Sequence, residues 1–428
     1  MTLIKRGFVL GTTVLAVAAV ATVSVSLHPK TQALLKDSPK NVVDEVWQLI
    51  DRTYVDATFN QTDWQAVRLD YLNRSYTDRE SAYTAIREMV ETLDDPYTRF
   101  MDPQEFRNMQ IDTSGELTGV GIQIAQDEET KNLTVVAPIE DTPAFEAGIV
   151  AGDIITRIDD VDTAGMDISD AVNLIRGPVD SEVRLTILRD QQELVVPITR
   201  ARIEIHPVRF ESRFESGVGK VGYIRLTQFS ANAAEEMRDA IRALEAEDVG
   251  SYVLDLRSNP GGLLYSSIDI ARMWLEEGVI VSTVNRQGLT DRQEAIGDAL
   301  TDKPLVILVD GGSASASEIL SGALQDNDRA SLVGTQTFGK GLVQSVRPLG
   351  DGSGLAITVA KYLTPNGLDI NEAGISPDVV VELTEEQREQ LRSDRTRIGT
   401  SSDPQYSEAI DVLMQQLATG TAAVPVPQ

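Results

Sequence analysis

The spacing of apolar residues divides the chain into segments with different predicted structures. Between residues 38 and 107, apolar side chains recur at helical spacing in two runs, Val42–Ile50 and Tyr83–Leu93. The second run ends at the sequence LDDP, because proline disfavours helix at its own position and at the preceding one. The pattern predicts a small helical domain, which we place at residues 34–112.

The next segment, residues 113–200, changes to short runs rich in Val and Ile between Gly and Pro residues. Such runs are typical of strands. One helical run, Ile168–Ile175, lies among them and ends at a Gly-Pro pair. The segment is therefore predicted to be a compact α+β module with strands at Gly121–Ala125, Leu133–Ala137, Ile154–Ile158 and Val183–Leu188.

From Gly219 onward, predicted strands alternate with predicted helices. This alternation favours an α/β domain with a mainly parallel sheet, which we place at residues 201–390. A charged tail follows at residues 391–428 and carries a helical pattern at Ser407–Leu417. The expected strands are Val221–Leu226, Ser251–Leu256 and Leu305–Val309, and the expected helices are Ala231–Ala246, Ser267–Trp274 and Ser317–Leu324.

The first 33 residues are typical of an export segment. Lys5 and Arg6 precede a run of 21 uncharged residues, Gly7–Leu27. A run of this length fits either a cleaved signal peptide or a retained membrane anchor. Both alternatives place the rest of the chain on the far side of a membrane.

Composition removes several classes of function. The 38 Lys and Arg residues against 66 Asp and Glu leave a net charge of −28, which disfavours binding to nucleic acid. The absence of Cys excludes thiol nucleophiles, iron–sulfur clusters and disulfides. Of the two histidines, His28 lies in the export segment and His206 is interpreted as a linker residue. A general base must therefore be sought among the lysines.

Two segments of the α/β domain are candidates for a nucleophile and its base. Ser315 lies in the turn between an apolar strand and a predicted helix, where a hydroxyl is exposed beside helix N–H groups; a polar helix cap is the alternative. Lys340 lies between two glycines, where apolar neighbours can desolvate its ammonium; a solvated hairpin tip is the alternative. A lysine that acts as a base near neutral pH needs a pKa of about 7–8, whereas free lysine has a pKa of about 10.4. This shift of the pKa corresponds to destabilising the charged form by roughly 4 kcal/mol. Gln344 is placed to orient the amine, since residues four apart share one face of a strand.

Two further segments are candidates for binding groups. The Asn259–Gly262 turn follows a buried strand and offers backbone N–H donors for an oxyanion, or is an ordinary β–α turn. In the middle module, the loop before the first strand can present N–H groups to a peptide carboxylate. Arg176 is either a positive charge beside that groove or a solvated surface residue. The loop residues concerned are Gly119, Val120, Gly121 and Ile122.

These motifs together resemble the carboxyl-terminal processing protease family. GVGI, TPA and AGI in the middle module resemble its PDZ domain, and DPYT its short motif before that domain. VLDLRSNPGG, GSASASEILSGAL, GKGLVQ, YLTPNG and EAGISPDVVV resemble its catalytic core. The resemblance implies a multidomain α+β and α/β fold: an N-terminal helical region, a PDZ domain and a crotonase-like protease core.

The resemblance also implies roles for individual residues. Ser315 matches the nucleophile, Lys340 the general base and Gln344 the residue that positions it. The N–H groups of Gly261 and Ala316 match the oxyanion hole. Arg176 falls where some members use an arginine to couple the PDZ domain to the active site.

The function implied is an exported serine endopeptidase that needs no metal or cofactor. It would cleave protein substrates with unstructured C-termini near that end, after capture by the PDZ domain, in a periplasm or a thylakoid lumen. The sequence looks most like the cyanobacterial and plastid branch, whose members trim a photosystem II reaction-centre precursor. A catalytically inactive PDZ peptide-binding protein and an acyl-CoA enzyme of the crotonase type are the alternatives, and a homo-oligomer is left open.

Overall fold

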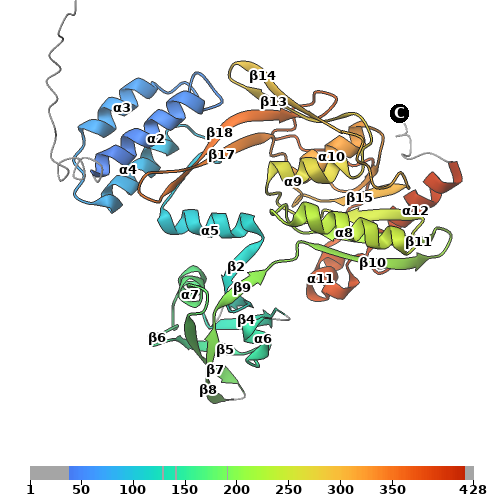
Figure 1. Ribbon diagram of the computed structural model, residues 1–428, viewed down its shortest axis with the longest axis horizontal. Coiled ribbons are helices and arrows are strands. Elements are labelled where there is room, and N and C mark those ends of the chain that lie inside the picture. Colours follow the sequence, from blue (N-terminus) through green and yellow to red (C-terminus); the bar gives the residue numbers. More distant parts are fainter. Residues whose placement is uncertain (1–37, 128–129, 140–141, 190, 420–428) are drawn as a thin grey trace, which may run out of the picture.

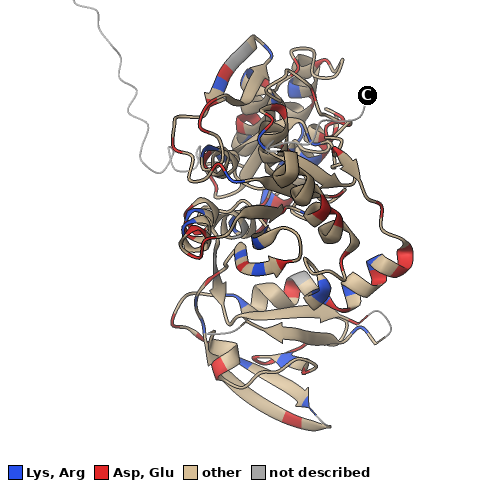
Figure 2. Ribbon diagram, turned by 90° about the vertical axis from the view of Figure 1, so that its right-hand side faces the viewer, with Lys and Arg blue, Asp and Glu red and all other residues tan. Residues whose placement is uncertain are grey.

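The computed structural model describes residues 38–127, 130–139, 142–189 and 191–419 (Figure 1). The predicted export segment, residues 1–33, lies outside them. Within the described residues, no helix is both long and apolar enough to cross a membrane. Acidic and basic residues are interspersed along the ribbon (Figure 2).

The N-terminal helices share their core with a distant sheet. The two predicted helical runs are confirmed as α2 (Pro39–Thr53) and α4 (Arg79–Glu91), and a further helix, α3 (Trp64–Asn73), lies between them in the chain. Trp47 and Trp64 stack with ring centroids 6.2 Å apart. The same apolar cluster includes Leu355 and Ile357, so the helices pack against strand β18 (Gly354–Leu363) and do not form a core of their own.

The sheet under these helices is antiparallel and was not predicted from the sequence. Its strand order is β1 (Arg99–Met101), β18, β13 (Val279–Asn285) and β14 (Gly288–Glu294), and β17 (Leu342–Pro348) also pairs with β18. Arg99 of β1 pairs with Ala356 of β18, so these strands come from distant parts of the chain and no local period links them. The sheet lies beside the parallel core in Figure 1.

The middle module is confirmed as an α+β unit. It is reached through α5 (Pro103–Ser114) and a two-stranded link of β2 (Glu116–Gly119) and β9 (Ala201–Glu204). Its core combines Leu133, Ile155 and Leu185 on the sheet with Ile175 on the module's longer helix. The elements are β3 (Ile122–Gln126), β4 (Leu133–Pro138), α6 (Pro143–Glu146), β5 (Ile154–Ile158), β6 (Val161–Asp162), α7 (Ile168–Ile175), β7 (Glu182–Arg189) and β8 (Gln192–Thr199).

The predicted parallel sheet is confirmed and has helices on both faces. Its strand order is β10 (Val208–Glu215), β11 (Gly219–Leu226), β12 (Ser251–Asp255), β15 (Leu305–Val309), β16 (Ser331–Gly334) and β19 (Val379–Val380), all parallel from β11 to β19. One face packs against α8 (Ala233–Ala246), α9 (Leu264–Arg272) and α10 (Ala316–Asp326). The opposite face packs against α12 (Pro404–Thr419).

The C-terminal segment differs from the charged tail expected from the sequence. After α11 (Glu385–Ser393) and the short 3₁₀ helix Arg395–Arg397, α12 begins three residues before the expected Ser407. Tyr406 and Leu413 on α12 are fully buried. This helix is therefore part of the packed domain, because one of its faces completes the cover of the sheet.

Candidate active site

The two turns singled out in the sequence meet at the carboxyl ends of β12 and β15. These strands are parallel neighbours, so the turns that follow them lie side by side. A Cβ atom on Gly261 would lie 3.0 Å from the Cβ of Ser315 and 2.7 Å from the carbonyl oxygen of Ala314. Gly261 also has a φ of +102°, a conformation that L side chains rarely adopt. Glycine is therefore required at the point where the turns touch.

Ser315 itself has an unusual backbone conformation. It precedes the first residue of α10 with φ 55° and ψ −110°. A non-glycine residue held in this way is strained, and such strain is concentrated at functional sites. Ala316 begins the helix, so its N–H has no acceptor within α10.

Buried Asn259 holds the two turns together. Its side-chain amide donates to the carbonyl of Leu226 at 2.9 Å, and its backbone carbonyl accepts from the N–H of Ala314 at 3.1 Å. That carbonyl also accepts from the hydroxyl of Ser317 at 2.8 Å. In addition, the backbone N–H of Gly261 donates to Asn259 Oδ1 at 2.9 Å, so this N–H group already has a hydrogen-bond acceptor.

The loop that carries Lys340 packs closely against a neighbouring backbone, as its flanking glycines suggest. A Cβ on Gly341 would lie 2.7 Å from the nitrogen of Asn371, and one on Gly339 would lie 3.0 Å from the nitrogen of Gly374. Gly339 also has a φ of +91°. Larger residues on either side of Lys340 would displace this loop.

Glu318 joins the serine turn to the lysine loop. Its fully buried carboxylate accepts four hydrogen bonds. Oε2 accepts from the backbone N–H of Ser315 at 2.8 Å and of Lys340 at 3.0 Å. Oε1 accepts from the Thr337 hydroxyl at 2.6 Å and the N–H of Gly339 at 2.7 Å. One carboxylate thus fixes both backbone segments.

Tyr362 supports the same two segments through their carbonyl groups. Its buried hydroxyl donates to the carbonyl of Ser315 at 3.2 Å and to the carbonyl of Lys340. Tyr362 lies on β18, so the antiparallel sheet takes part in building the site.

The Lys340 side chain points to an aromatic ring. Its ammonium lies 4.8 Å from the ring centroid of Tyr97, and no hydrogen bond within the described residues joins it to Ser315. Burial lowers the pKa of Lys340 below its ordinary value, and the charge of Arg99 lowers it further, while Asp95 and Glu318 oppose the shift. A lysine with a lowered pKa is a better proton acceptor near neutral pH.

Gln344 does not contact Lys340 in this arrangement. Its amide donates to the carbonyl of Leu342 at 3.2 Å. We expected Lys340 and Gln344 to share one face because side chains alternate along a regular strand. However, the pairing of β17 with β18 shifts register between Val343 and Gln344. The bulge removes the alternation on which the expectation was based.

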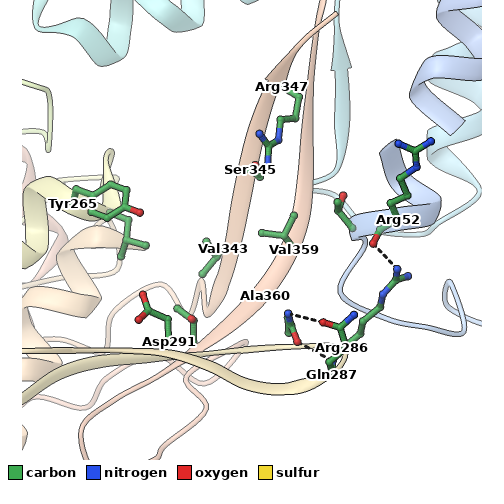
Figure 3. Close-up of a pocket in the computed structure, with 14 residues that line it drawn as sticks. Arg52, Tyr265, Arg286, Gln287, Asp291, Val343, Ser345, Arg347, Val359 and Ala360 are labelled. Atoms are coloured by element: carbon green, nitrogen blue, oxygen red, sulfur yellow. Dashed lines mark hydrogen bonds between the residues drawn. The ribbon is translucent and has the colours of Figure 1, made fainter. Parts of the chain in front are cut away.

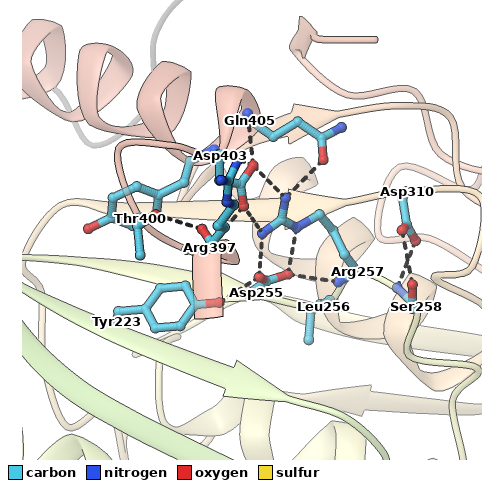
Figure 4. A network of polar contacts seen from close by, with 12 residues as sticks. Tyr223, Asp255, Leu256, Arg257, Ser258, Asp310, Arg397, Thr400, Asp403 and Gln405 are labelled. Atoms are coloured by element: carbon cyan, nitrogen blue, oxygen red, sulfur yellow. Dashed lines mark hydrogen bonds and ion pairs between the residues drawn. The ribbon is translucent and has the colours of Figure 1, made fainter. Parts of the chain in front are cut away.

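A buried ionic network connects the strand before the Gly261 turn to the C-terminal segment (Figure 4). Arg257 donates to Asp255 at 2.6 Å, to Asp403 at 2.7 Å and to Gln405 at 3.0 Å. Tyr223 donates to Asp255 at 2.7 Å. Burial alone would raise the pKa of Asp255, but the charge and hydrogen bonds of Arg257 hold it below its usual value. The network anchors α12 beside the turn.

A groove of about 370 Å³ is lined in part by residues that follow the Gly261 turn and the Lys340 loop in the chain (Figure 3). Leu264 and Tyr265, which follow the Gly261 turn, form one side, and Val343 and Ser345 of β17 follow the lysine loop. Arg286 closes the far side by donating to backbone carbonyls at the end of α2. The lining residues of these two segments begin three positions after Gly261 and three positions after Lys340.

The middle module contains a second, smaller cavity of about 180 Å³. Its lining brings together the predicted binding residues, and Arg176 donates to Asn108 of α5 at 3.3 Å. The groove is mainly apolar, as expected for a site that takes the last side chain of a peptide. The lining residues are Gly119, Val120, Gly121, Ile122, Ile124, Ile139, Ile168, Val172, Ile175 and Arg176.

Sequence reasoning did not assign roles to Glu318, Tyr97, Asn259 or Tyr362. Glu318 had a weak signal, because a glutamate three residues after a serine is typical of a capping box at a helix start. Asn259 belongs to the turn singled out in the sequence, but its side chain was given no role there, and Tyr97 and Tyr362 reach the site only through tertiary contacts. His206 is exposed and contacts Glu236 at 2.9 Å, which agrees with its interpretation as a linker residue.

Comparisons with known proteins identify the family and agree with the fold. The family model for peptidase family S41 matches residues 220–381, and a PDZ domain model matches residues 134–189. The chain is 46% identical over 397 residues to the carboxyl-terminal-processing protease of Synechocystis sp., an alignment that covers 92% of this chain and 91% of that protein. The chain belongs to the carboxyl-terminal processing protease family.

Further relatives extend the match to chloroplast proteins. Carboxyl-terminal-processing peptidase 2, chloroplastic, of Arabidopsis thaliana is 42% identical and is covered over 74% of its length by 85% of this chain. A solved structure of the photosystem II D1 C-terminal processing protease aligns with a TM-score of 0.58 at 37% identity, covering 86% of this chain and 99% of that one. The chain is thus a serine-type peptidase with a PDZ domain, and the sequence prediction of family, fold and activity is confirmed.

Proposed function

We propose that this protein is an exported endopeptidase in which Ser315 attacks the substrate and Lys340 is the general base. The observation that supports this most directly is the Glu318 carboxylate, which binds the backbone N–H groups of both residues. A serine and a lysine that are far apart in sequence are thereby held in one rigid unit beside a groove.

The chemistry follows from these positions. Lys340, neutral at the start of the cycle, accepts the Ser315 hydroxyl proton as Oγ attacks the peptide carbonyl. Lys340 then gives this proton to the leaving amine, and an acyl-enzyme remains. A water molecule attacks the acyl-enzyme, releases the new C-terminus and restores the serine.

Two rearrangements prepare this reaction in our proposal. The Lys340 amine turns from the Tyr97 ring towards the Ser315 hydroxyl, and Gln344 takes up its positioning role only in that state. The oxyanion accepts hydrogen bonds from the N–H groups of Ala316 and Gly261. The latter group must first be released from, or shared with, Asn259 Oδ1.

We further propose that the PDZ groove binds the substrate C-terminus. Its Ile-rich lining favours an apolar final side chain, and the loop from Gly119 to Ile122 offers N–H groups for the terminal carboxylate. Arg176 links this groove to α5 through Asn108, so a bound peptide can alter the contact between the PDZ domain and the N-terminal region.

The similarity to the photosystem II D1 C-terminal processing protease supports a photosystem II precursor as substrate. The cyanobacterial and chloroplast relatives support a location in the thylakoid lumen or periplasm, reached by means of residues 1–33. Whether that segment is cleaved or kept as an anchor is tested by sequencing the N-terminus of the protein isolated from membranes and from the soluble fraction.

The catalytic proposal is tested by cleavage of a folded reporter with an unstructured C-terminal tail. We expect tail removal by the wild-type protein and none by Ser315→Ala or Lys340→Ala. Lys361→Ala is the matched control, because Lys361 is an exposed residue of β18 that pairs with Asp369. Unchanged cleavage by either catalytic variant would refute the dyad.

Substrate placement is tested separately in each groove. Ile122→Asp in the PDZ groove should raise KM for the tailed reporter, whereas Val161→Asp, exposed elsewhere in the same module, should not. Ser345→Arg should block the groove of Figure 3, whereas Val346→Arg on the same strand should leave cleavage intact. Equal effects within either pair would contradict the assignment.

A further inference from the structure

Among the strands that the structure describes, β10 is at one edge of the central sheet. It pairs with β11 on one side and ends the strand order on the other (Figure 1). Two aromatic side chains of this edge strand are exposed, Phe214 by 83% and Phe210 by 44%. Exposed edges that carry apolar side chains are sites where another strand can add to a sheet.

The sequence of β10 is complementary to itself in the antiparallel direction. When a second copy is centred on Ser212, Glu211 lies opposite Arg213 and Arg209 lies opposite Glu215. On the other face, Phe210 lies opposite the Phe214 of the second copy. Opposite charges and aromatic pairs at directly facing positions stabilise antiparallel strands.

No neighbouring symmetric register has this property. Centring on Glu211 would place Arg209 opposite Arg213, and centring on Arg213 would place Glu211 opposite Glu215. Shifting the register by an odd number of residues would make the odd-numbered side chains of one strand face the even-numbered side chains of the other. The two sheets would then not share their faces. Charge therefore selects one register out of those that symmetry allows.

The surroundings of β10 fit a partner that continues the sheet. Charged residues on an edge strand commonly prevent pairing with other chains, but here their signs alternate so that they attract a second copy. Arg213 is already ordered, because it pairs with Glu211 of its own strand and packs over the rings of Tyr223 and Tyr406 at 4.6 and 5.5 Å from their centroids; in the dimer it would share its charge with Glu211 of both copies. Little side-chain entropy is then lost when its charge meets that of Glu211 in the second copy.

We propose that β10 mediates a symmetric homodimer, in which two copies pair antiparallel about Ser212 and join their central sheets. The two-fold axis runs perpendicular to the sheet, so α8 of each copy lies on the same face. This proposal does not depend on the catalytic roles given above, because β10 contains none of those residues.

The absence of native cysteine allows a direct test in the full-length chain. Directly opposite residues in an antiparallel pair have Cα atoms about 4.5–5.5 Å apart, within the range of a disulfide. Ser212→Cys should therefore form a disulfide-linked dimer on mild oxidation, visible on a non-reducing gel and reversed by reductant. Ser216→Cys is the control, because the two copies of residue 216 would lie about 27 Å apart at about 3.4 Å per residue.

The register is tested by charge reversal in the Ser212→Cys background. Arg209→Glu and Glu215→Arg each create two like-charge pairs per dimer, and each should weaken dimerisation about tenfold or more. A mixture of these two variants should restore cross-linking as a heterodimer, since each altered residue then faces an opposite charge. Phe214→Glu should also reduce cross-linking, unlike Phe145→Glu, which changes an exposed phenylalanine of the PDZ domain.

Three results would overturn the proposal. The first is that Ser212→Cys cross-links no faster than Ser216→Cys. The second is cross-linking that the charge reversals leave unchanged. The third is failure of the mixed variants to recover it, which would mean that the losses came from altered folding. Cleavage of the tailed reporter by each variant reports separately on the active site.

Discussion

The buried carboxylate of Glu318 offers the sharpest test of how the active site is built. Glu318→Gln keeps the size and shape of the side chain but replaces one acceptor oxygen with an NH₂ group. In the wild-type structure, the N–H groups of Ser315 and Lys340 both donate to Oε2. The oxygen that remains in the variant can accept both of these hydrogen bonds. The new NH₂ group then faces the Thr337 hydroxyl, which can turn to accept, and the N–H of Gly339, which cannot.

The loss of stability in Glu318→Gln follows from the hydrogen bonds that the variant keeps and loses. One buried N–H loses its acceptor, at about 1–3 kcal/mol, and the other hydrogen bonds lose the strength that a charged acceptor supplies. We expect Glu318→Gln to lower the free energy of unfolding by about 2–4 kcal/mol. Displacement of either loop by about 1 Å is enough to lower kcat by about 100-fold.

The assay combines urea denaturation with steady-state cleavage of the tailed reporter. The control is Glu245→Gln, since Glu245 is another hydrogen-bonded carboxylate of the same domain, paired with Lys303 and Tyr252. We expect it to lower stability without lowering kcat. If Glu318→Gln keeps wild-type kcat at temperatures where it is folded, then the carboxylate does not position the serine and lysine loops.

Three other predictions follow from the site. Arg99→Gln removes a charge that lowers the pKa of Lys340, so the rise of kcat/KM with pH should move to higher pH and activity at neutral pH should fall. Arg388→Gln, an exposed position on α11, is the control, and an unmoved pH profile of Arg99→Gln would contradict the assignment of Lys340 as base. Gly261→Ala places a methyl group 2.7 Å from a backbone oxygen at a φ of +102°, and should cost about 1–3 kcal/mol of stability together with most of kcat, as measured by thermal unfolding and reporter cleavage. Arg257→Met leaves two buried carboxylates without their partner and should cost about 3–5 kcal/mol in urea denaturation; a smaller loss would show that the network of Figure 4 contributes little to the fold.

Much of the local structure was predictable because it depends on short-range periodicity and turn chemistry. The bounds of α7, β5 and β15 agree with the apolar runs Ile168–Ile175, Ile154–Ile158 and Leu305–Val309. The motifs around Ser315 and Lys340 were recognisable for a related reason. Gly261 and Gly341 stand where another backbone approaches too closely for a side chain, so the glycines of these motifs marked a real structural constraint.

The antiparallel sheet could not be predicted from the sequence. Its strands are separated by long segments, and β18 receives the N-terminal helices on a face that no local pattern identifies. Gln344 illustrates the same limit on a smaller scale. Its side chain turns away from Lys340 because of a bulge, and a bulge is a property of two paired strands.

The sequence by itself determined which residues of this chain are suited to peptide hydrolysis: a serine in a tight turn, a lysine between glycines and a pair of glycines after a buried strand. The tertiary structure decided how they are held. Glu318 and Tyr362 join two loops that are distant in sequence, Tyr97 receives the lysine ammonium, and β10 becomes an edge whose charges match a second copy. Hydrogen bonds and ion pairs act over a few ångströms, so only the folded chain determines which of these partners meet.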